Sequence, residues 1–164
     1  MTEKRQPILV LGLGNDILGD DAVGLVAARR LREQCPAGAE VIEAAEGGLG
    51  LLDFLEGRSH ALLLDAILTG RHPVGTVLEF SHQDFRSTIG PSPHYAGLPE
   101  VLRLAECLAI PVPTELCVLS MEVEDPYLLR EGLSLAVDQA LPGYVERARQ
   151  ILDGWGGNPV LGGA

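Results

Sequence analysis

Short apolar runs alternate with helix-patterned segments through most of the chain, and few folds accept that order. The segments whose hydrophobicity and bounding turn residues predict strands are residues 7–13, 40–44, 60–66, 75–80 and 116–123. The segments with helical spacing are residues 21–34, 49–55, 97–108 and 135–152, the last with a kink or break expected at Pro142. Strands that alternate with helices indicate a sheet covered by helices on both faces.

The fold class follows from the connections between these segments. Residues 75–80 come too soon after the preceding strand for a helical crossover, so this strand is expected to run antiparallel. The prediction is a three-layer α/β/α sandwich with a five-stranded mixed sheet and one antiparallel strand. The 164 residues suit a single domain, which we place at residues 1–153, followed by a Gly-rich tail at 154–164 that is expected to be disordered.

The net charge and the cysteine content restrict the classes of partner and the cellular compartment that we expect for this protein. Twelve basic and 23 acidic residues give a net charge of −11, which repels nucleic acid phosphates and anionic lipid. The N-terminal apolar stretch, residues 7–14, is too short to span a membrane. Three cysteines without a C-x-x-C pair fit a reducing cytoplasm, and Cys107 and Cys117 are expected to be inert core thiols.

The first candidate site is the glycine-rich turn at residues 12–21, which ends in Asp20 and Asp21. It begins like a dinucleotide fingerprint, but Ile17 stands where the third glycine is required, and the carboxylates occupy the place of a pyrophosphate. In the alternative interpretation an aspartate only caps the following helix, as single acids here usually do. Two adjacent acids leave one of them available for chemistry.

Two further candidates lie downstream. Asp65 sits inside the apolar run 62–67, where a carboxylate is costly to bury unless it is paired or binds a metal. The alternative is a strand-end aspartate that accepts backbone N–H bonds. His94 lies in the Pro-rich segment 91–97, and its alternative is a solvated surface histidine.

Asp21, Asp65 and His94 each follow or end a different predicted strand, so one edge of the sheet should collect them. Two carboxylates and an imidazole form an O,O,N ligand set that suits borderline divalent ions and leaves coordination positions for water or substrate. A serine nucleophile is disfavoured, because the near G-x-S-x-G stretch at residues 57–61 precedes a strand instead of linking a strand to a helix.

Several of these stretches together resemble a known family. Residues 8–15 and 19–24 (ILVLGLGN and GDDAVG), then residues 64–66, 92–94 with 97–98, and 132–134, resemble in order the signatures of the nickel–iron hydrogenase maturation endopeptidases. The similarity extends from about residue 8 to residue 151. The resemblance implies a mixed five-stranded sheet of the phosphorylase/hydrolase-like type.

The resemblance also implies a function. It implies a cytoplasmic, monomeric peptidase, aspartic-type by family classification, that removes the C-terminal extension of a nickel-loaded hydrogenase large-subunit precursor. Family metal ligands and catalytic residues map onto Asp21, Asp65 and His94, with Ni²⁺ supplied by the substrate and Cd²⁺ or Zn²⁺ as surrogates. The metal's role as Lewis acid or as recognition tether stays open, as does the hydrogenase isoenzyme.

One loop departs from the family pattern. Glu46, Gly47 and Gly48, expected to bind substrate, are followed by Leu49 where the family often has a threonine-like hydroxyl, which changes the substrate contacts expected of this loop. The alternative function is a maturation chaperone or checkpoint that binds the nickel-loaded precursor without cutting it.

Overall fold

The computed structural model describes residues 7–34, 38–81, 84 and 97–156. Its elements, in chain order, are β1 (Ile8–Leu13), η1 (Gly19–Ala22), α1 (Val23–Glu33), β2 (Ala39–Ala44), η2 (Gly48–Gly50), α2 (Leu51–Leu55), β3 (His60–Ile67), β4 (Val77–Ser81), α3 (Leu98–Cys107), β5 (Glu115–Glu122) and α4 (Leu135–Trp155). All five predicted strands and all four predicted helices are present. None of the helices in these ranges is both long and apolar enough to cross a membrane.

The sheet has the strand order β2-β1-β3-β5-β4. β1 pairs in parallel with both β2 and β3, and β3 pairs in parallel with β5. β4 pairs antiparallel with β5, which confirms the reversed strand predicted from the short connection. Because β2 and β3 lie on opposite sides of β1, the strand order changes direction at β1 and β3. Ligands of such sheets usually bind beyond the carboxyl ends of the strands at this switch point.

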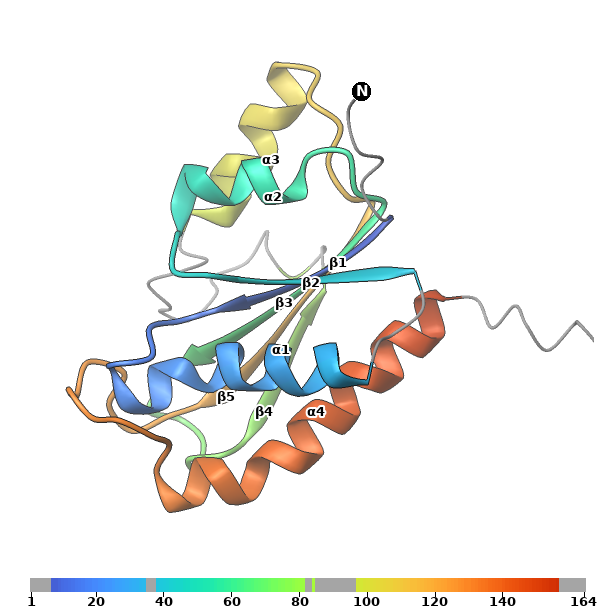
Figure 1. The fold of residues 1–164 in the computed structure, drawn as a ribbon. Helices are drawn as coiled ribbons and strands as arrows, with labels where there is room; N and C mark the ends of the chain where they lie inside the picture. Colours follow the sequence, from blue (N-terminus) through green and yellow to red (C-terminus); the bar gives the residue numbers. More distant parts are fainter. Residues whose placement is uncertain (1–6, 35–37, 82–83, 85–96, 157–164) are drawn as a thin grey trace, which may run out of the picture.

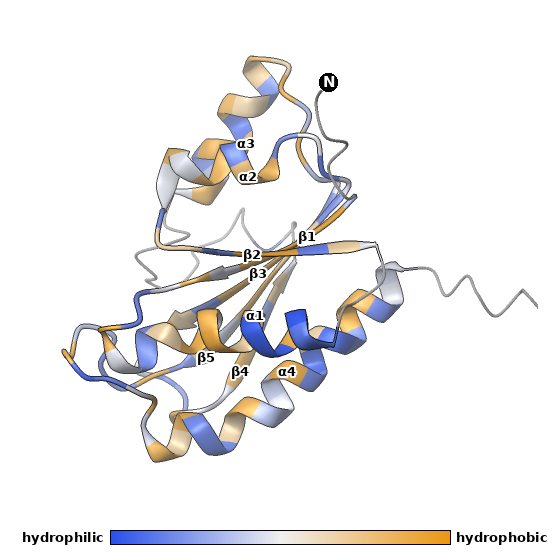
Figure 2. Cartoon of the chain, in the orientation of Figure 1, coloured by the Kyte–Doolittle hydropathy of each residue, from blue (hydrophilic) through white to orange (hydrophobic). Residues whose placement is uncertain are grey.

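Helices cover both faces of the sheet, as the three-layer prediction requires (Figure 1). α1 and α4 lie on one face, and α2 and α3 lie on the other. The sheet between them is mainly apolar, whereas α1 and α4 carry both apolar and polar residues (Figure 2). Successive residues of β3 alternate between the two cores: Leu62, Leu64 and Ala66 pack toward α1 and α4, while Leu63 and Ile67 pack toward α2 and α3.

Glycines allow α1 to approach the sheet closely. A Cβ placed on Gly24 would lie 2.2 Å from the carbonyl oxygen of Leu64 and 2.5 Å from that of Leu13. A Cβ on Gly12 would lie 2.6 Å from the Cβ of Ala28. The start of α1 is therefore held directly against the ends of β1 and β3.

Three expectations need correction. α4 continues through Pro142 without a break, because Pro142 is exposed and water can hydrate the carbonyl that loses its N–H partner. α4 also reaches Trp155, inside the tail predicted as disordered, while residues 157–164 lie outside the described ranges. Cys107 is exposed, not a core thiol, because the buried stripe of α3 is Leu98, Val101 and Ala105.

Candidate functional site

Asp21 and Asp65 lie at the carboxyl edge of the sheet, at the switch point. Asp21 belongs to η1, which follows β1 and contacts β3. Asp65 belongs to β3, one residue beyond Leu64, the last β3 residue paired with β1. Both are buried, Asp21 at 2% and Asp65 at 0% exposure. The structure therefore brings two of the three predicted ligands to the same edge.

The backbone of Asp21 is fixed by a close approach at Gly14. Gly14 has φ of +152°, and a Cβ on it would lie 2.2 Å from the carbonyl oxygen of Asp21. The amide of Asp21 donates a 3.1 Å hydrogen bond to the carbonyl of Leu18. A side chain at position 14 would push η1 away from β1, which explains why the turn requires glycine there.

Asp20 and Asp21 have different tasks. The two carboxylate oxygens of Asp20 accept hydrogen bonds from the backbone amide and the hydroxyl of Ser134, both at 2.7 Å. Ser134 is the residue before α4, so Asp20 connects η1 to the start of α4 and does not cap α1. Neither η1 nor α1 has a side-chain cap. The Asp20 carboxylate is thus held by these two hydrogen bonds to Ser134, and of the two acids Asp21 stays the predicted ligand.

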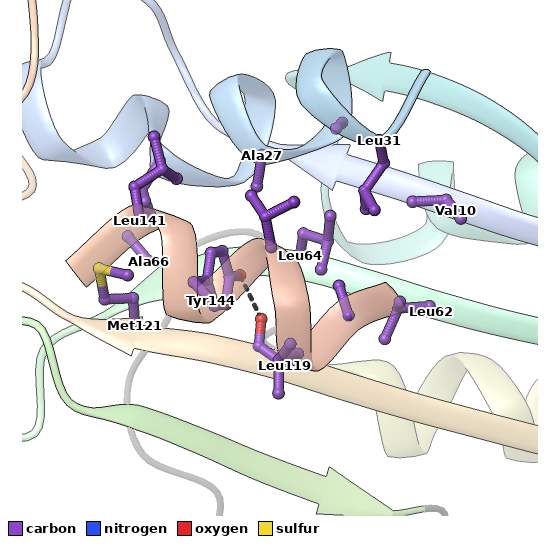
Figure 3. Packing of buried hydrophobic residues seen from close by; sticks show 14 of the residues in the cluster. Val10, Ala27, Leu31, Leu62, Leu64, Ala66, Leu119, Met121, Leu141 and Tyr144 are labelled. Carbon is purple, nitrogen blue, oxygen red and sulfur yellow. Dashed lines mark hydrogen bonds between the residues drawn. The ribbon is translucent and has the colours of Figure 1, made fainter. Parts of the chain in front are cut away.

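A tyrosine from α4 positions the backbone of Asp65. The amide of Asp65 donates to Oη of Tyr144 at 3.2 Å, and this hydroxyl donates to the carbonyl of Leu119 at 2.5 Å (Figure 3). The buried Tyr144 hydroxyl thus bridges β3 and β5. By the strand alternation, the side chain of Asp65 lies on the opposite face, toward α2 and α3. Its Oδ1 accepts the amide of Ala66 at 2.8 Å, so the backbone N–H bond of the alternative interpretation is present.

Two buried polar residues of β5 escaped prediction. Ser120 pairs with Asp65 in the strand register, and Glu122 pairs with Ile67. Their exposures are 0% and 1%, and the alternation places both on the Asp65 face. Glu122 accepts hydrogen bonds from the amide and hydroxyl of Thr69, directly after β3. The period-two spacing of 120 and 122 within an apolar strand was the available signal.

The predicted substrate loop follows β2 at the same edge. The amide of Gly14 donates to the carbonyl of Ala44 at 3.2 Å, which joins the ends of β1 and β2. Glu46 is exposed, Gly47 is extended and Gly48, with φ of +56°, starts η2. The contact of this loop with a substrate stays a prediction.

An open depression of about 320 Å³ lies beyond β1 and β2, lined in part by Gly14, Asp16 and Glu43. Arg29 binds Asp16 through two hydrogen bonds of 2.9 and 2.7 Å and binds Glu43 at 2.7 Å. The hydrogen bonds from Arg29 hold the pKa of Asp16 below its usual range. Since these two acids are already paired with arginine, and since neither Asp21 nor Asp65 lines the depression, it is not the predicted ligand site.

His94 lies outside the described residues, so the full O,O,N set stays a prediction. Within the ranges that the structure describes, no group of three His, Cys, Asp or Glu side chains is close enough to hold a metal ion. The predicted set would therefore need a third ligand in addition to Asp21 and Asp65, for which the prediction names His94. Carboxylate oxygens and one imidazole nitrogen would suit a borderline divalent ion.

Comparisons with known proteins point in one direction. A family model described as hydrogenase maturation protease matches residues 25–151. The hydrogenase 2 maturation protease of Escherichia coli is 35% identical over 101 residues, which are 58% of this chain and only 60% of that relative. The hydrogenase expression/formation protein HupD of Rhodobacter capsulatus is 28% identical over 155 residues, 89% of this chain and 73% of HupD. The solved structure of the E. coli hydrogenase maturating endopeptidase HybD aligns with a TM-score of 0.77 and 27% identity, covering 91% of this chain and 93% of HybD.

Proposed function

Since the chain belongs to the hydrogenase maturation protease family, a family of peptidases, we propose that it is the endopeptidase that removes the C-terminal extension of a nickel-loaded hydrogenase large-subunit precursor. The observation that carries the proposal is the pair of buried aspartates at the β1–β3 switch point, positioned by separate backbone devices. A buried carboxylate is retained at a cost in desolvation, which a cationic substrate group offsets.

The residues take distinct roles in this proposal. Asp21, Asp65 and His94 bind the substrate's nickel, and the segment Glu46, Gly47 and Gly48 contacts the backbone of the extension. A bound divalent ion polarises a carbonyl or lowers the pKa of a bound water, so the reaction needs no serine or cysteine nucleophile. In this proposal the enzyme is metal-dependent because the reaction uses the substrate's nickel. Asp21 and Asp65 are the aspartates to which the aspartic-type classification refers.

The proposal also names the compartment and the oligomeric state in which the enzyme acts. The chain acts as a monomer in the cytoplasm, where its cysteines stay reduced and where a metal-loaded precursor is accessible before it folds around its site. The substrate supplies the nickel, so the enzyme selects precursors that already hold it.

The test compares wild type with Asp21→Asn on nickel-loaded and nickel-free precursor, following the released C-terminal fragment by mass spectrometry. Asp21→Asn should lower the rate with loaded precursor by about 100-fold or more, because a group that contacts the reacting centre loses its charge. Asp138→Asn, an exposed acid in the first turn of α4, is the matched control and should cut at the wild-type rate.

Three outcomes contradict parts of the proposal. Equal cutting of nickel-free precursor would remove metal recognition. Wild-type rates in Asp21→Asn, with the fold intact by circular dichroism, would remove Asp21 from the site. Tight binding of loaded precursor by wild type without any mass change would establish the non-cleaving chaperone or checkpoint instead.

A further inference from the structure

Exposed apolar side chains cluster beside the candidate site. In the part of the chain that the structure describes, most of the exposed large hydrophobic residues lie on two loops, between β1 and α1 and between β5 and α4, and on the first residue of α4. They are Ile17 at 57%, Tyr127 at 67%, Leu128 at 52%, Leu129 at 73% and Leu135 at 71% exposure. We call these five residues the apolar patch. Scattered single hydrophobic residues are ordinary on a surface, but such a cluster marks an interaction site.

The two loops of the apolar patch form one structure. The amide of Arg130 donates to the carbonyl of Ile17 at 3.0 Å, and the amide of Gly19 donates to the carbonyl of Arg130 at 2.8 Å. The Asp20–Ser134 hydrogen bonds join the same two loops a few residues further along. In Figure 1 the orange loop before α4 lies beside the start of α1, and Figure 2 shows both apolar and polar colours along it.

This arrangement connects the patch to the site. Asp21 lies two residues after the segment 17–19 that pairs with Arg130, and its own amide donates a hydrogen bond to the carbonyl of Leu18. A partner bound to the apolar patch at Ile17 therefore lies only four residues along the chain from Asp21, a candidate metal ligand. The loop is also braced internally, since Oδ1 of Asp125 accepts the amide of Tyr127 at 2.9 Å. A surface held in this way needs little ordering when it binds.

The border of the patch is acidic. Glu124, Asp125 and Glu131 are exposed, and none of them forms an ion pair with another residue of the described ranges. Arg130 is the basic residue among them. An apolar centre with a charged border is the usual anatomy of a protein interface. A second copy of this chain would bring the same acidic border and a net charge of −11, so repulsion disfavours self-association.

We propose that the apolar patch is the docking surface for the folded body of the precursor, through an apolar area bordered by lysine or arginine. This rests on the proposed function and adds to it a contact separate from the extension that enters the site. Docking at the patch raises affinity for the whole precursor and sets the direction from which its C-terminus reaches Asp21. The patch residues themselves are not catalytic.

The decisive variant is Tyr127→Ser/Leu129→Ser, which removes two exposed side chains and leaves the core untouched. Its KM for nickel-loaded precursor should rise about tenfold or more, the effect of losing central interface residues, while kcat at saturating precursor stays at the wild-type value. The control is Leu104→Ser/Leu108→Ser, two exposed leucines at the end of α3, which should leave both constants unchanged. Glu124→Lys/Glu131→Lys should slow association at low salt, and the difference should shrink as ionic strength rises.

The outcomes separate this proposal from the proposed function. An unchanged KM in Tyr127→Ser/Leu129→Ser, with wild type cutting normally, overturns the docking surface and leaves the peptidase proposal standing. A wild-type dimer in analytical ultracentrifugation that the double variant dissolves assigns the patch to self-association and likewise overturns it. If wild type neither binds nor cuts any loaded precursor, the proposed function fails and the docking proposal fails with it.

Discussion

Replacing Gly24 by alanine should move the start of α1 and with it Asp21. The new Cβ would lie 2.2 Å from the carbonyl oxygen of Leu64 and 2.5 Å from that of Leu13. Both obstacles are backbone atoms of central strands, so neither can rotate away as a side chain could. Because real Cβ atoms essentially never come within 3.0 Å of such atoms, the helix must retreat by at least 3.0 − 2.2 = 0.8 Å.

The stability change has two opposing parts. Forcing an extra carbon into a close-packed interior costs about 1–3 kcal/mol, and two rigid carbonyls place this site near the upper end. Alanine in place of glycine inside a helix returns about 1 kcal/mol. The net loss is about 2 kcal/mol, which lowers the Tm of a chain of this length by about 4–8 °C.

The effect on activity should exceed the effect on stability. Asp21 lies in the turn that leads into α1, three residues before Gly24, so it moves with the helix. A displacement of about 1 Å of a catalytic group can lower a rate about 100-fold. The assay measures Tm by circular dichroism and the processing rate at saturating nickel-loaded precursor, at a temperature where both proteins are folded.

Gly143→Ala is the matched control. Gly143 lies inside α4, and a Cβ placed on it would meet nothing within 4 Å, so alanine there should raise stability by up to about 1 kcal/mol and leave processing unchanged. If Gly24→Ala melts as high as Gly143→Ala and cuts at the wild-type rate, close packing of α1 on the sheet does not position Asp21.

Three further predictions concern buried groups. Tyr144→Phe removes the hydroxyl that bridges β3 and β5, so it should lower the free energy of unfolding, measured by urea titration, by about 1–3 kcal/mol. The control is Tyr127→Phe at an exposed tyrosine, which should change this free energy by less than about 0.5 kcal/mol. Equal values for the two variants would show that the bridge contributes nothing to stability. Burial raises the pKa of Cys117 to about 12, so at pH 8 iodoacetamide should label the exposed Cys107 and leave Cys117 and processing intact, as peptide mapping will show. Because this folded-state pKa is above the ordinary 9.0, the stability that the protonated thiol contributes is complete below pH 9 and is lost as the pH rises toward 12. Between pH 8 and pH 11 the Tm of Cys117→Ser should therefore fall less than the Tm of wild type.

Local patterns sufficed for most of the fold. Each strand needed only a short apolar run, and the reversed β4 needed only the length of one connection. The sequence pointed to Asp21 as a candidate ligand, but it did not predict the hydrogen bonds between Asp20 and Ser134, which lies more than a hundred residues away. The period-two spacing of Ser120 and Glu122 is visible in the sequence, but their place on the Asp65 face depends on the register with β3, which a single strand does not reveal.

Other misses have similar causes. The apolar patch joins two loops without periodicity, so nothing in either segment predicts the other. Cys107 looked apolar because its neighbours are, but the buried stripe of α3 turns away from it. His94 lies outside the described residues, so its place in the site stays a prediction.

The glycine-rich turn after β1 shows how a small change in sequence reverses the charge that a site accepts. In a dinucleotide site, glycines bring a helix N-terminus toward a phosphate, and the positive end of the helix dipole binds the anion. Here Gly12 and Gly24 bring α1 equally close to the sheet, but Gly14 admits the backbone of η1 in front of it, carrying Asp20 and Asp21. The dipole of α1 then stabilises carboxylates of the chain itself, and the Asp20 carboxylate accepts two hydrogen bonds from Ser134. Asp21 and Asp65 are both buried at this edge of the sheet, at the switch point. Under the proposed function, we therefore expect the architecture that elsewhere binds an anion to accept the substrate's cation here.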